Sequence, residues 1–317
     1  MAEVQTVRGP VDDGALGRTL PHEHILMGGA EGIANFNHAW GEPWWDEEVR
    51  IADAAAKLQA AVDAGISTVV DPTAFGLGRD VRRIRRVNEQ VDVNIVVCTG
   101  VYAFLELPGF FKYRSAPQLA ELFVRELREG IDDTGIRAGF LKCAVEAHGI
   151  AGDLPLILDA IAAAAVETGA PVMVHTNAPA RTSHLALAAL TARGVEPSRI
   201  VVAHAGDSND LDYLRLLAGT GAFLGYDRFN IPHFNPDERR IATLLPLLAE
   251  GYGDRIHLSH DAAAFFDFMS GNPLFAEERP DYLHITEKVL PRLRDEGVTE
   301  EQIDQLMIES PRRWLAG

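Results

Sequence analysis

The 317-residue sequence is poor in cysteine, in basic residues and in long apolar stretches. Its two cysteines, Cys98 and Cys143, cannot build a disulfide framework, and such low usage is typical of a reducing cytosol. The formal net charge of −17 argues against nucleic-acid and anionic-membrane partners, because both require basic patches. The Ala-rich stretch 154–166 contains Asp159 and is too short to span a bilayer. The first residues, Met-Ala-Glu-Val-Gln-Thr, do not resemble a signal peptide, so we expect a cytoplasmic protein.

Linkers, low-complexity tracts and fixed-period repeats are also lacking, so we expect one domain over residues 1–317. What recurs is a short apolar run followed by an Ala- or Leu-rich amphipathic stretch. The strand-like runs lie at 16–24, 66–71, 94–100, 138–143, 171–175, 200–204, 222–226 and 256–260. Helical spacing and glycine stop signals predict helices at 48–64, 154–168, 183–193 and 210–218.

Eight strand–helix units in a chain of this length predict an α/β protein, a single-domain (β/α)₈ TIM barrel. The alternative is a doubly wound open sheet, which normally carries a Gly-rich phosphate loop after its first strand. The only candidate loop, Gly76-Leu77-Gly78, lacks a third glycine at the required spacing. The barrel is therefore favoured.

Ionisable and aromatic side chains follow the carboxyl ends of these runs. They are His22-Glu23-His24, Asp71, Tyr102, Lys142, His175, His204, Tyr226-Asp227-Arg228 and His260-Asp261. In a barrel these ends meet at one rim, where desolvated ionisable groups need a partner, and a metal centre is the simplest one. Residues two apart on a strand share a face, so His22 and His24 can both point inward and suit a borderline ion such as zinc.

Lys142 needs a separate explanation, because an ammonium group in a metal site would repel cations. Burial favours the neutral amine, and a neutral lysine can add carbon dioxide to become an anionic carbamate with two oxygens. One oxygen per metal would let Lys142 bridge two cations. The residues alone leave open that Lys142 instead points outward into a salt bridge.

The sequence resembles the phosphotriesterase family of the amidohydrolase superfamily, in its phosphotriesterase-like lactonase branch. The matching segments follow the family order over nearly the whole chain. They are Gly17-Arg18-Thr19-Leu20-Pro21-His22-Glu23-His24, Gly139-Phe140-Leu141-Lys142, Val174-His175-Thr176, Ala203-His204-Ala205-Gly206-Asp207, Gly225-Tyr226-Asp227-Arg228-Phe229, Leu258-Ser259-His260-Asp261 and Ser310-Pro311-Arg312-Arg313.

The resemblance implies a hydrolase with two divalent metal ions, with zinc favoured and cobalt, iron or manganese as alternatives. It assigns a buried metal to His22, His24 and Asp261, and a more exposed metal to His175 and His204. Carboxylated Lys142 and a hydroxide would bridge the two. Asp261 would also take the proton of the attacking hydroxide.

The substrate implied by the resemblance is a lactone such as an N-acyl-homoserine lactone, with organophosphate triesters as a side activity and a homodimer as the assembly. Tyr102 and Arg228 match residues that flank the lactone site, and both are candidate catalytic and substrate-binding residues. The segment 262–280 resembles an extended final loop whose aromatic residues, Phe268 among them, would bind the acyl chain. One departure from the family pattern is Asn230, which stands where a glycine is expected.

Three other functions remain open on sequence grounds. A dedicated phosphotriesterase would use the same centre. A glycosidase built on Asp71 and Asp227 would leave the rim histidines without a role. A non-catalytic member of the family would keep the fold and bind a ligand or partner.

Overall fold

The computed structural model describes residues 2–39, 41, 43–267 and 281–317. Its main sheet has eight strands in the order β11-β10-β9-β8-β7-β6-β5-β3, and every pairing within it is parallel. These strands are β3 (Thr19–Leu20), β5 (Thr68–Asp71), β6 (Asn94–Gly100), β7 (Phe140–Val145), β8 (Val172–Thr176), β9 (Ile200–Ala203), β10 (Phe223–Tyr226) and β11 (Ile256–Leu258). The sheet closes nearly completely into a barrel, which confirms the predicted (β/α)₈ fold.

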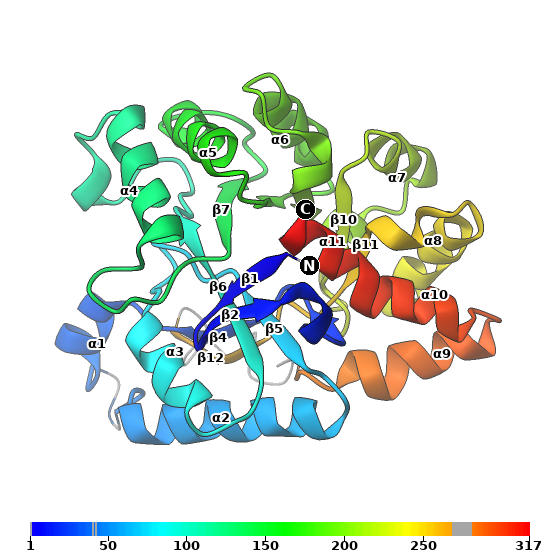
Figure 1. Ribbon diagram of the computed structural model, residues 1–317, viewed down its shortest axis with the longest axis horizontal. Coiled ribbons are helices and arrows are strands. Elements are labelled where there is room, and N and C mark those ends of the chain that lie inside the picture. Colours follow the sequence, from blue (N-terminus) through cyan, green and yellow to red (C-terminus); the bar gives the residue numbers. More distant parts are fainter. Residues whose placement is uncertain (1, 40, 42, 268–280) are drawn as a thin grey trace.

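Helices surround the barrel (Figure 1). They are α1 (Ala30–Phe36), α2 (Glu47–Asp63), α3 (Val81–Asn88), α4 (Ala116–Arg128), α5 (Leu154–Thr168), α6 (Thr182–Thr191), α7 (Leu211–Ala218), α8 (Asp237–Ala249), α9 (Leu290–Asp295) and α10 (Glu300–Asp304). The predicted glycine stop of α5 is observed. The helix ends at Gly169, whose φ of 74° is the left-handed conformation that glycine adopts at little cost. At the start of α2, the Asp46 side chain accepts a hydrogen bond from the Val49 amide.

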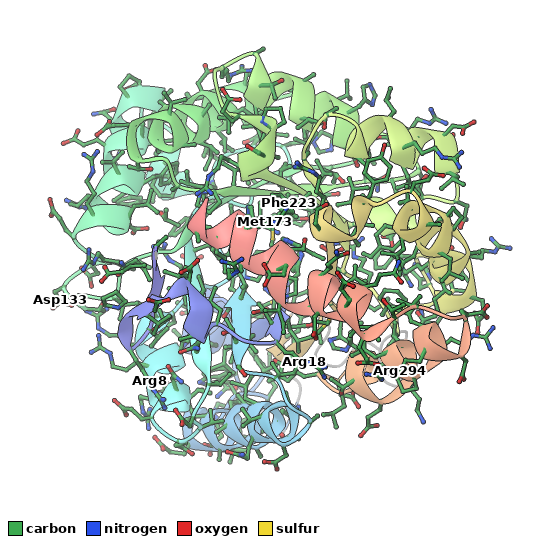
Figure 2. All side chains as sticks on the ribbon, turned by 45° about the vertical axis from the view of Figure 1, so that its right-hand side comes forward. Arg8, Arg18, Asp133, Met173, Phe223 and Arg294 are labelled. Carbon is green, nitrogen blue, oxygen red and sulfur yellow. The ribbon has the colours of Figure 1, made fainter. Side chains whose placement is uncertain are left out.

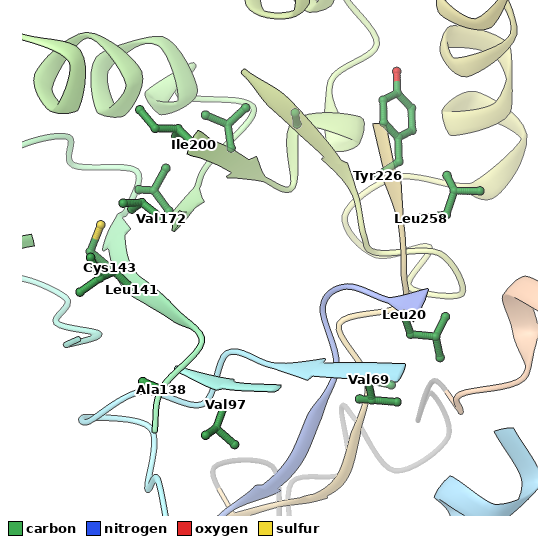
Figure 3. Close-up of a cluster of buried hydrophobic side chains, with 14 of the residues drawn as sticks. Leu20, Val69, Val97, Ala138, Leu141, Cys143, Val172, Ile200, Tyr226 and Leu258 are labelled. Atoms are coloured by element: carbon green, nitrogen blue, oxygen red, sulfur yellow. The ribbon is translucent and has the colours of Figure 1, made fainter. Parts of the chain in front are cut away.

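Side chains alternate between the two faces of the barrel strands. Figure 3 shows Val69, Val97, Leu141, Val172, Ile200 and Leu258 on the strands, in the core cluster that packs beneath the helices. Residues of the opposite parity, among them Val70, Val96, Phe140, Met173, Val201 and Phe223, form a second cluster inside the barrel. In Figure 2, Met173 and Phe223 lie near the middle of the molecule, while Asp133 and Arg294 lie at its edge.

One end of the barrel is closed by segments from both ends of the chain. The antiparallel hairpin of β1 (Glu3–Thr6) and β2 (Gly9–Asp12) and the helix α11 (Ser310–Ala316) lie over the middle of the ring (Figure 1). Val4 and Trp314 belong to the inner cluster, and the Trp314 ring packs on Phe140 at 5.2 Å. The hairpin and α11 fill this end of the barrel. Polar side chains can therefore gather at the opposite end, where the strands have their carboxyl ends.

The first predicted strand, 16–24, is divided in the structure. β3 pairs with β5, and the chain bends at Pro21 before β4 (His24–Met27) pairs with β12 (Ala263–Phe266) in a separate two-stranded sheet. Proline has no amide hydrogen to donate, so a strand that contains it is readily interrupted there. Along the described residues, no helix combines the length and the apolarity needed to cross a bilayer.

Candidate metal centre

Strand alternation brings Lys142 and His175 into the barrel. Lys142 lies two residues after Phe140 on β7, and His175 two residues after Met173 on β8, so both share the inward parity of those core residues. Both side chains are buried, Lys142 to within 1% of full burial.

His204 and Asp261 reach the centre by a different route. Each follows a short strand, and each adopts a left-handed backbone, with φ of 66° at His204 and 54° at Asp261. Residues other than glycine seldom adopt this conformation, and where they do so the surrounding structure must hold them there. Asn230, at the position where glycine was expected, also has a φ of 66°, and asparagine tolerates that conformation.

His22, His24 and Asp261 form one compact group of donor atoms. Nε2 of His22 and Nε2 of His24 each lie 3.3 Å from Oδ1 of Asp261. Their ligand atoms lie within 4.8 Å of one another, as a cation site of two imidazoles and a carboxylate requires.

His175 and His204 form a second group beside the first. Nδ1 of His175 lies 2.9 Å from Nε2 of His204, and that Nε2 lies 3.9 Å from Oδ2 of Asp261. Burial lowers the pKa of both imidazoles, that of His175 to about 4, so both are neutral at pH 7. Neutral imidazoles are the form that binds metals.

Asp227 orients one histidine of each group. Its Oδ2 accepts from Nδ1 of His22 at 2.7 Å, and its Oδ1 accepts from Nδ1 and the backbone amide of His204, at 2.9 and 2.8 Å. Burial acts to raise the pKa of Asp227, but the two imidazoles hold it well below its usual value, so the carboxylate only accepts. Both rings therefore turn Nε2 toward the centre.

Asp227 is also close enough to His22 and His204 to be grouped with them as a ligand. We instead place Asp227 behind the imidazoles, because its oxygens face the protonated Nδ1 atoms. This arrangement of carboxylate, imidazole and cation is usual around metal sites.

A similar chain orients His24. Its Nδ1 lies 2.7 Å from Oγ1 of Thr73, which in turn donates to Oδ1 of Asp71 at 2.5 Å. Asp71 and Asp227 are thus both buried behind histidines. Neither is free to serve as one of the paired carboxylates of a glycosidase, which removes the support for that alternative.

The Lys142 amine is buried in this centre. Among the described residues no carboxylate is close enough to pair with it, and burial lowers its pKa. The outward salt bridge that the residues alone left open is therefore not formed by the described residues. A buried amine with a lowered pKa is the form that reacts with carbon dioxide.

Tyr102 and Arg228 flank the two groups. The Tyr102 ring meets His175 edge-on, with 5.2 Å between ring centroids, and its hydroxyl donates to Glu146. Arg228 donates from Nε to Oδ2 of Asp261 at 2.9 Å and from Nη1 to Asp207 at 3.2 Å. Both side chains are thus oriented by carboxylates at the rim.

The predicted acyl-chain loop is only partly described. Phe268 lies outside the described residues. Phe265 is buried on β12 rather than open to a channel, and it packs against Trp44 and Trp45 with centroid separations of 6.1 and 5.0 Å.

Glu23 holds the backbone around Asp261 from the other side of the strand. The carboxylate is fully buried and accepts from four donors: Ser259 Oγ at 2.7 Å, the His260 amide at 2.9 Å, His260 Nδ1 at 2.6 Å and the Ala262 amide at 2.9 Å. His260 is accordingly a support for this loop and faces away from the candidate ligands. The network explains how Asp261 is kept in its left-handed conformation.

We expect the substitution Glu23→Gln to lower the free energy of unfolding by about 1–3 kcal/mol, because the amide group would leave at least one buried donor without an acceptor. Urea denaturation measures this change. Glu89→Gln, at an exposed position, is the matched control and should change stability by no more than about 0.5 kcal/mol. Equal stability of the two variants would contradict the role given to Glu23.

Sequence reasoning assigned no role in the centre to Asp227, Thr73 or Glu146. The sequence does contain a signal for Glu146, because this residue lies four positions after Lys142 and therefore falls on the same face of the strand. The sequence contains no such signal for Thr73, because the contact of Thr73 with His24 depends on how two loops meet.

Comparisons with known proteins find matches along nearly the whole chain. The family model described as "Phosphotriesterase family" matches residues 2–315. The chain is 39% identical to "Phosphotriesterase homology protein" of Mycobacterium tuberculosis, over 99% of this chain and 97% of that protein. It is 35% identical to "Aryldialkylphosphatase" of Saccharolobus solfataricus, over 95% of each chain. A solved structure, described as the phosphotriesterase from Mycobacterium tuberculosis, superposes with a TM-score of 0.92 at 39% identity, covering 99% of this chain and 98% of that one.

Proposed function

Because the chain belongs to the phosphotriesterase family and is therefore a metal-dependent hydrolase, we propose that it opens lactones such as N-acyl-homoserine lactones and hydrolyses organophosphate triesters as a side reaction. Family membership confirms the resemblance to the phosphotriesterase family; the lactonase branch remains part of the proposal. The observation that carries the lactone proposal is the pair of side chains at the rim: Tyr102 lies against His175, and Arg228 lies 2.9 Å from Asp261. A hydroxyl and a guanidinium so placed suit a polar ring ester beside the centre.

In this proposal two divalent cations, with zinc favoured, are held by His22, His24 and Asp261 and by His175 and His204. When bound, they would supply an activated water and polarise the substrate oxygen. The Lys142 amine, in its neutral form, would add carbon dioxide, forming a nitrogen–carbon bond with release of one proton, and the resulting carbamate would hold both cations. The two facing nitrogens of His175 and His204, 2.9 Å apart, support a cation at that position.

The chain's own residues supply the remaining steps. Asp261 would accept the proton of the attacking water, since Oδ1 faces the imidazoles while Oδ2 remains on the side of Arg228. Tyr102 and Arg228 would orient the ester, and Arg228 is held for this by Asp207 and by its position 4.0 Å over the Phe234 ring. Phe268 is proposed to contact the acyl chain.

The second candidate is a dedicated phosphotriesterase. It is favoured by the 35% identity to a protein described as aryldialkylphosphatase. Both activities use the same centre, so the ligand residues do not separate them.

We further propose that the protein is cytoplasmic and forms a homodimer. The segment between β6 and α4 supports the dimer, because it exposes Phe104, Leu105, Phe110 and Tyr113. Exposed apolar side chains gathered in one segment are typical of an interaction surface.

We expect two equivalents of divalent metal per chain by mass spectrometry, and loss of lactonase activity on exhaustive chelation followed by recovery with added zinc. Activity that survives chelation would contradict the proposed centre. The ranking of substrates is tested by kcat/KM on a long-chain acyl-homoserine lactone and on paraoxon. A higher value for paraoxon would favour the dedicated phosphotriesterase.

A further inference from the structure

Glu146 lies at the rim of the barrel, immediately after β7. It shares the inward parity of Lys142, and its side chain is 19% exposed. One oxygen, Oε1, makes two contacts: it accepts the hydroxyl hydrogen of Tyr102, and it lies 3.3 Å from Nε2 of His175. The edge-on contact between the Tyr102 and His175 rings completes a triangle of three side chains.

The Glu146 contact selects the tautomer of His175. Oε1 of Glu146 faces Nε2 of His175 and also receives the hydroxyl hydrogen of Tyr102, and a carboxylate oxygen only accepts hydrogen bonds. A ring hydrogen on Nε2 of His175 would therefore face an acceptor, and it would leave Nδ1 unprotonated. That Nδ1 faces Nε2 of His204, which is also unprotonated because Nδ1 of His204 donates to Asp227.

The other three candidate imidazoles are oriented from deeper in the barrel. His22 and His204 both donate to Asp227, which is 1% exposed, and His24 contacts Thr73, which is 4% exposed. Within the described part of the chain, Glu146 is the acceptor that faces Nε2 of His175. This one histidine thus faces a partly exposed carboxylate.

We propose that Glu146 is a positioning residue that holds Nδ1 of His175 toward the second cation and couples that site to Tyr102. The inference rests on the proposed function, since it assumes a cation between His175 and His204. Glu146 faces the opposite ring nitrogen from that cation, so it acts through His175 and is not a ligand of that cation. Because Tyr102 donates its hydrogen to the same oxygen, the phenol offers its lone pairs to the rim, and Tyr102 is poised to accept rather than to donate.

The test is a metal titration of the metal-free protein against a competing chelator, comparing wild type with Glu146→Ala, Glu146→Gln and Tyr102→Phe. We expect wild type to bind two cations. In Glu146→Ala the weaker site should lose roughly 10–100-fold in affinity, the usual effect of removing such a partner, while the tighter site stays within about 2-fold. Glu146→Gln should lose less, because its amide oxygen can still accept from Nε2, and Tyr102→Phe should retain most of the second-site affinity.

Two measurements separate positioning from misfolding. Thermal unfolding of the metal-free variants is expected to match that of Glu89→Gln, the exposed control. The kcat of Glu146→Ala should recover at saturating metal, which a distorted fold would not permit.

The possible results separate a failure of this inference from a failure of the proposed function. Wild type that binds no pair of cations overturns the proposed function and this inference together. Wild type that binds two cations, with unchanged second-site affinity in Glu146→Ala, overturns only the role of Glu146. Tyr102→Phe keeps the ring against His175 and removes only the hydroxyl, so an equal loss in Tyr102→Phe and Glu146→Ala would show that the carboxylate by itself does not orient His175, and it also overturns that role.

Discussion

Replacement of Lys142 with methionine is expected to lower kcat/KM on the preferred ester by ~10³-fold or more, the scale on which loss of a main electrostatic stabiliser acts. The fold should be unharmed. Lys142 is buried to within 1% of full burial and has no carboxylate counter-ion among the described residues, so methionine removes an unpaired polar group and keeps most of the volume. Exchange of a buried ionisable group for an apolar one of similar size is often neutral or stabilising.

The measurement pairs steady-state kinetics with thermal unfolding of the same preparations. Lys112→Met is the matched control, because Lys112 pairs with Glu106 and Asp153 at the surface and should matter little to either quantity. Intact-protein mass spectrometry under native conditions should show wild type, but not Lys142→Met, heavier by one carbon dioxide. Reloading of metal-free wild type should be faster with bicarbonate present.

A variant at position 142 that loses stability along with activity would argue against this account. So would a Lys142→Met protein that binds two cations as tightly as wild type.

Substitution of Asp227 by asparagine is expected to weaken metal binding roughly 10–100-fold and to lower kcat/KM by ~10²–10⁴-fold, because it forces the wrong tautomer on at least one histidine. The carboxylate accepts from Nδ1 of His22 with one oxygen and from Nδ1 and the amide of His204 with the other. An amide has only one accepting oxygen. Whichever imidazole meets the new NH₂ group must move its hydrogen to Nε2, the atom that faces the cations.

Asp71→Asn is the matched control for this experiment. Asp71 accepts from the Thr73 hydroxyl and from the Thr73 amide with the same oxygen, and asparagine retains such an oxygen. Its loss in metal affinity should therefore be smaller than that of Asp227→Asn. Metal content per chain, calorimetric titration and circular dichroism of both variants measure the difference, and equal losses would contradict the tautomer argument.

The sequence predicts the direction of a side chain where the regular strand determines that direction. It fails where a special backbone conformation determines it. Strand alternation is a local property with a period of two residues, so it puts Lys142 on the same strand face as Phe140 and His175 on the same face as Met173. Whether Lys142 faces inward or outward was left open by the sequence and was decided by the structure. The same alternation would have found Glu146. It cannot place His204 and Asp261, whose inward direction comes from left-handed backbone at φ of 66° and 54°.

That backbone is imposed by distant residues. Asp261 is held by the Glu23 network and by its amide, which donates to the His22 carbonyl, while Asp227 accepts from the His204 amide. Phe265 illustrates the same limit, because it looked like part of an open aromatic loop. It is instead a buried strand residue, since β12 finds β4 as its partner.

The sequence by itself determined the barrel, the end of the barrel at which polar groups gather, and the residue types that can bind two cations. It could do so because the hydrophobic period and the order of the strands are local properties of the chain. Only the tertiary structure decided which nitrogen of each imidazole faces the centre, and which carboxylates stand behind the ligands rather than among them. Those choices depend on hydrogen bonds between residues such as His22 and Asp227, far apart in the chain, whose partners are set when the barrel closes.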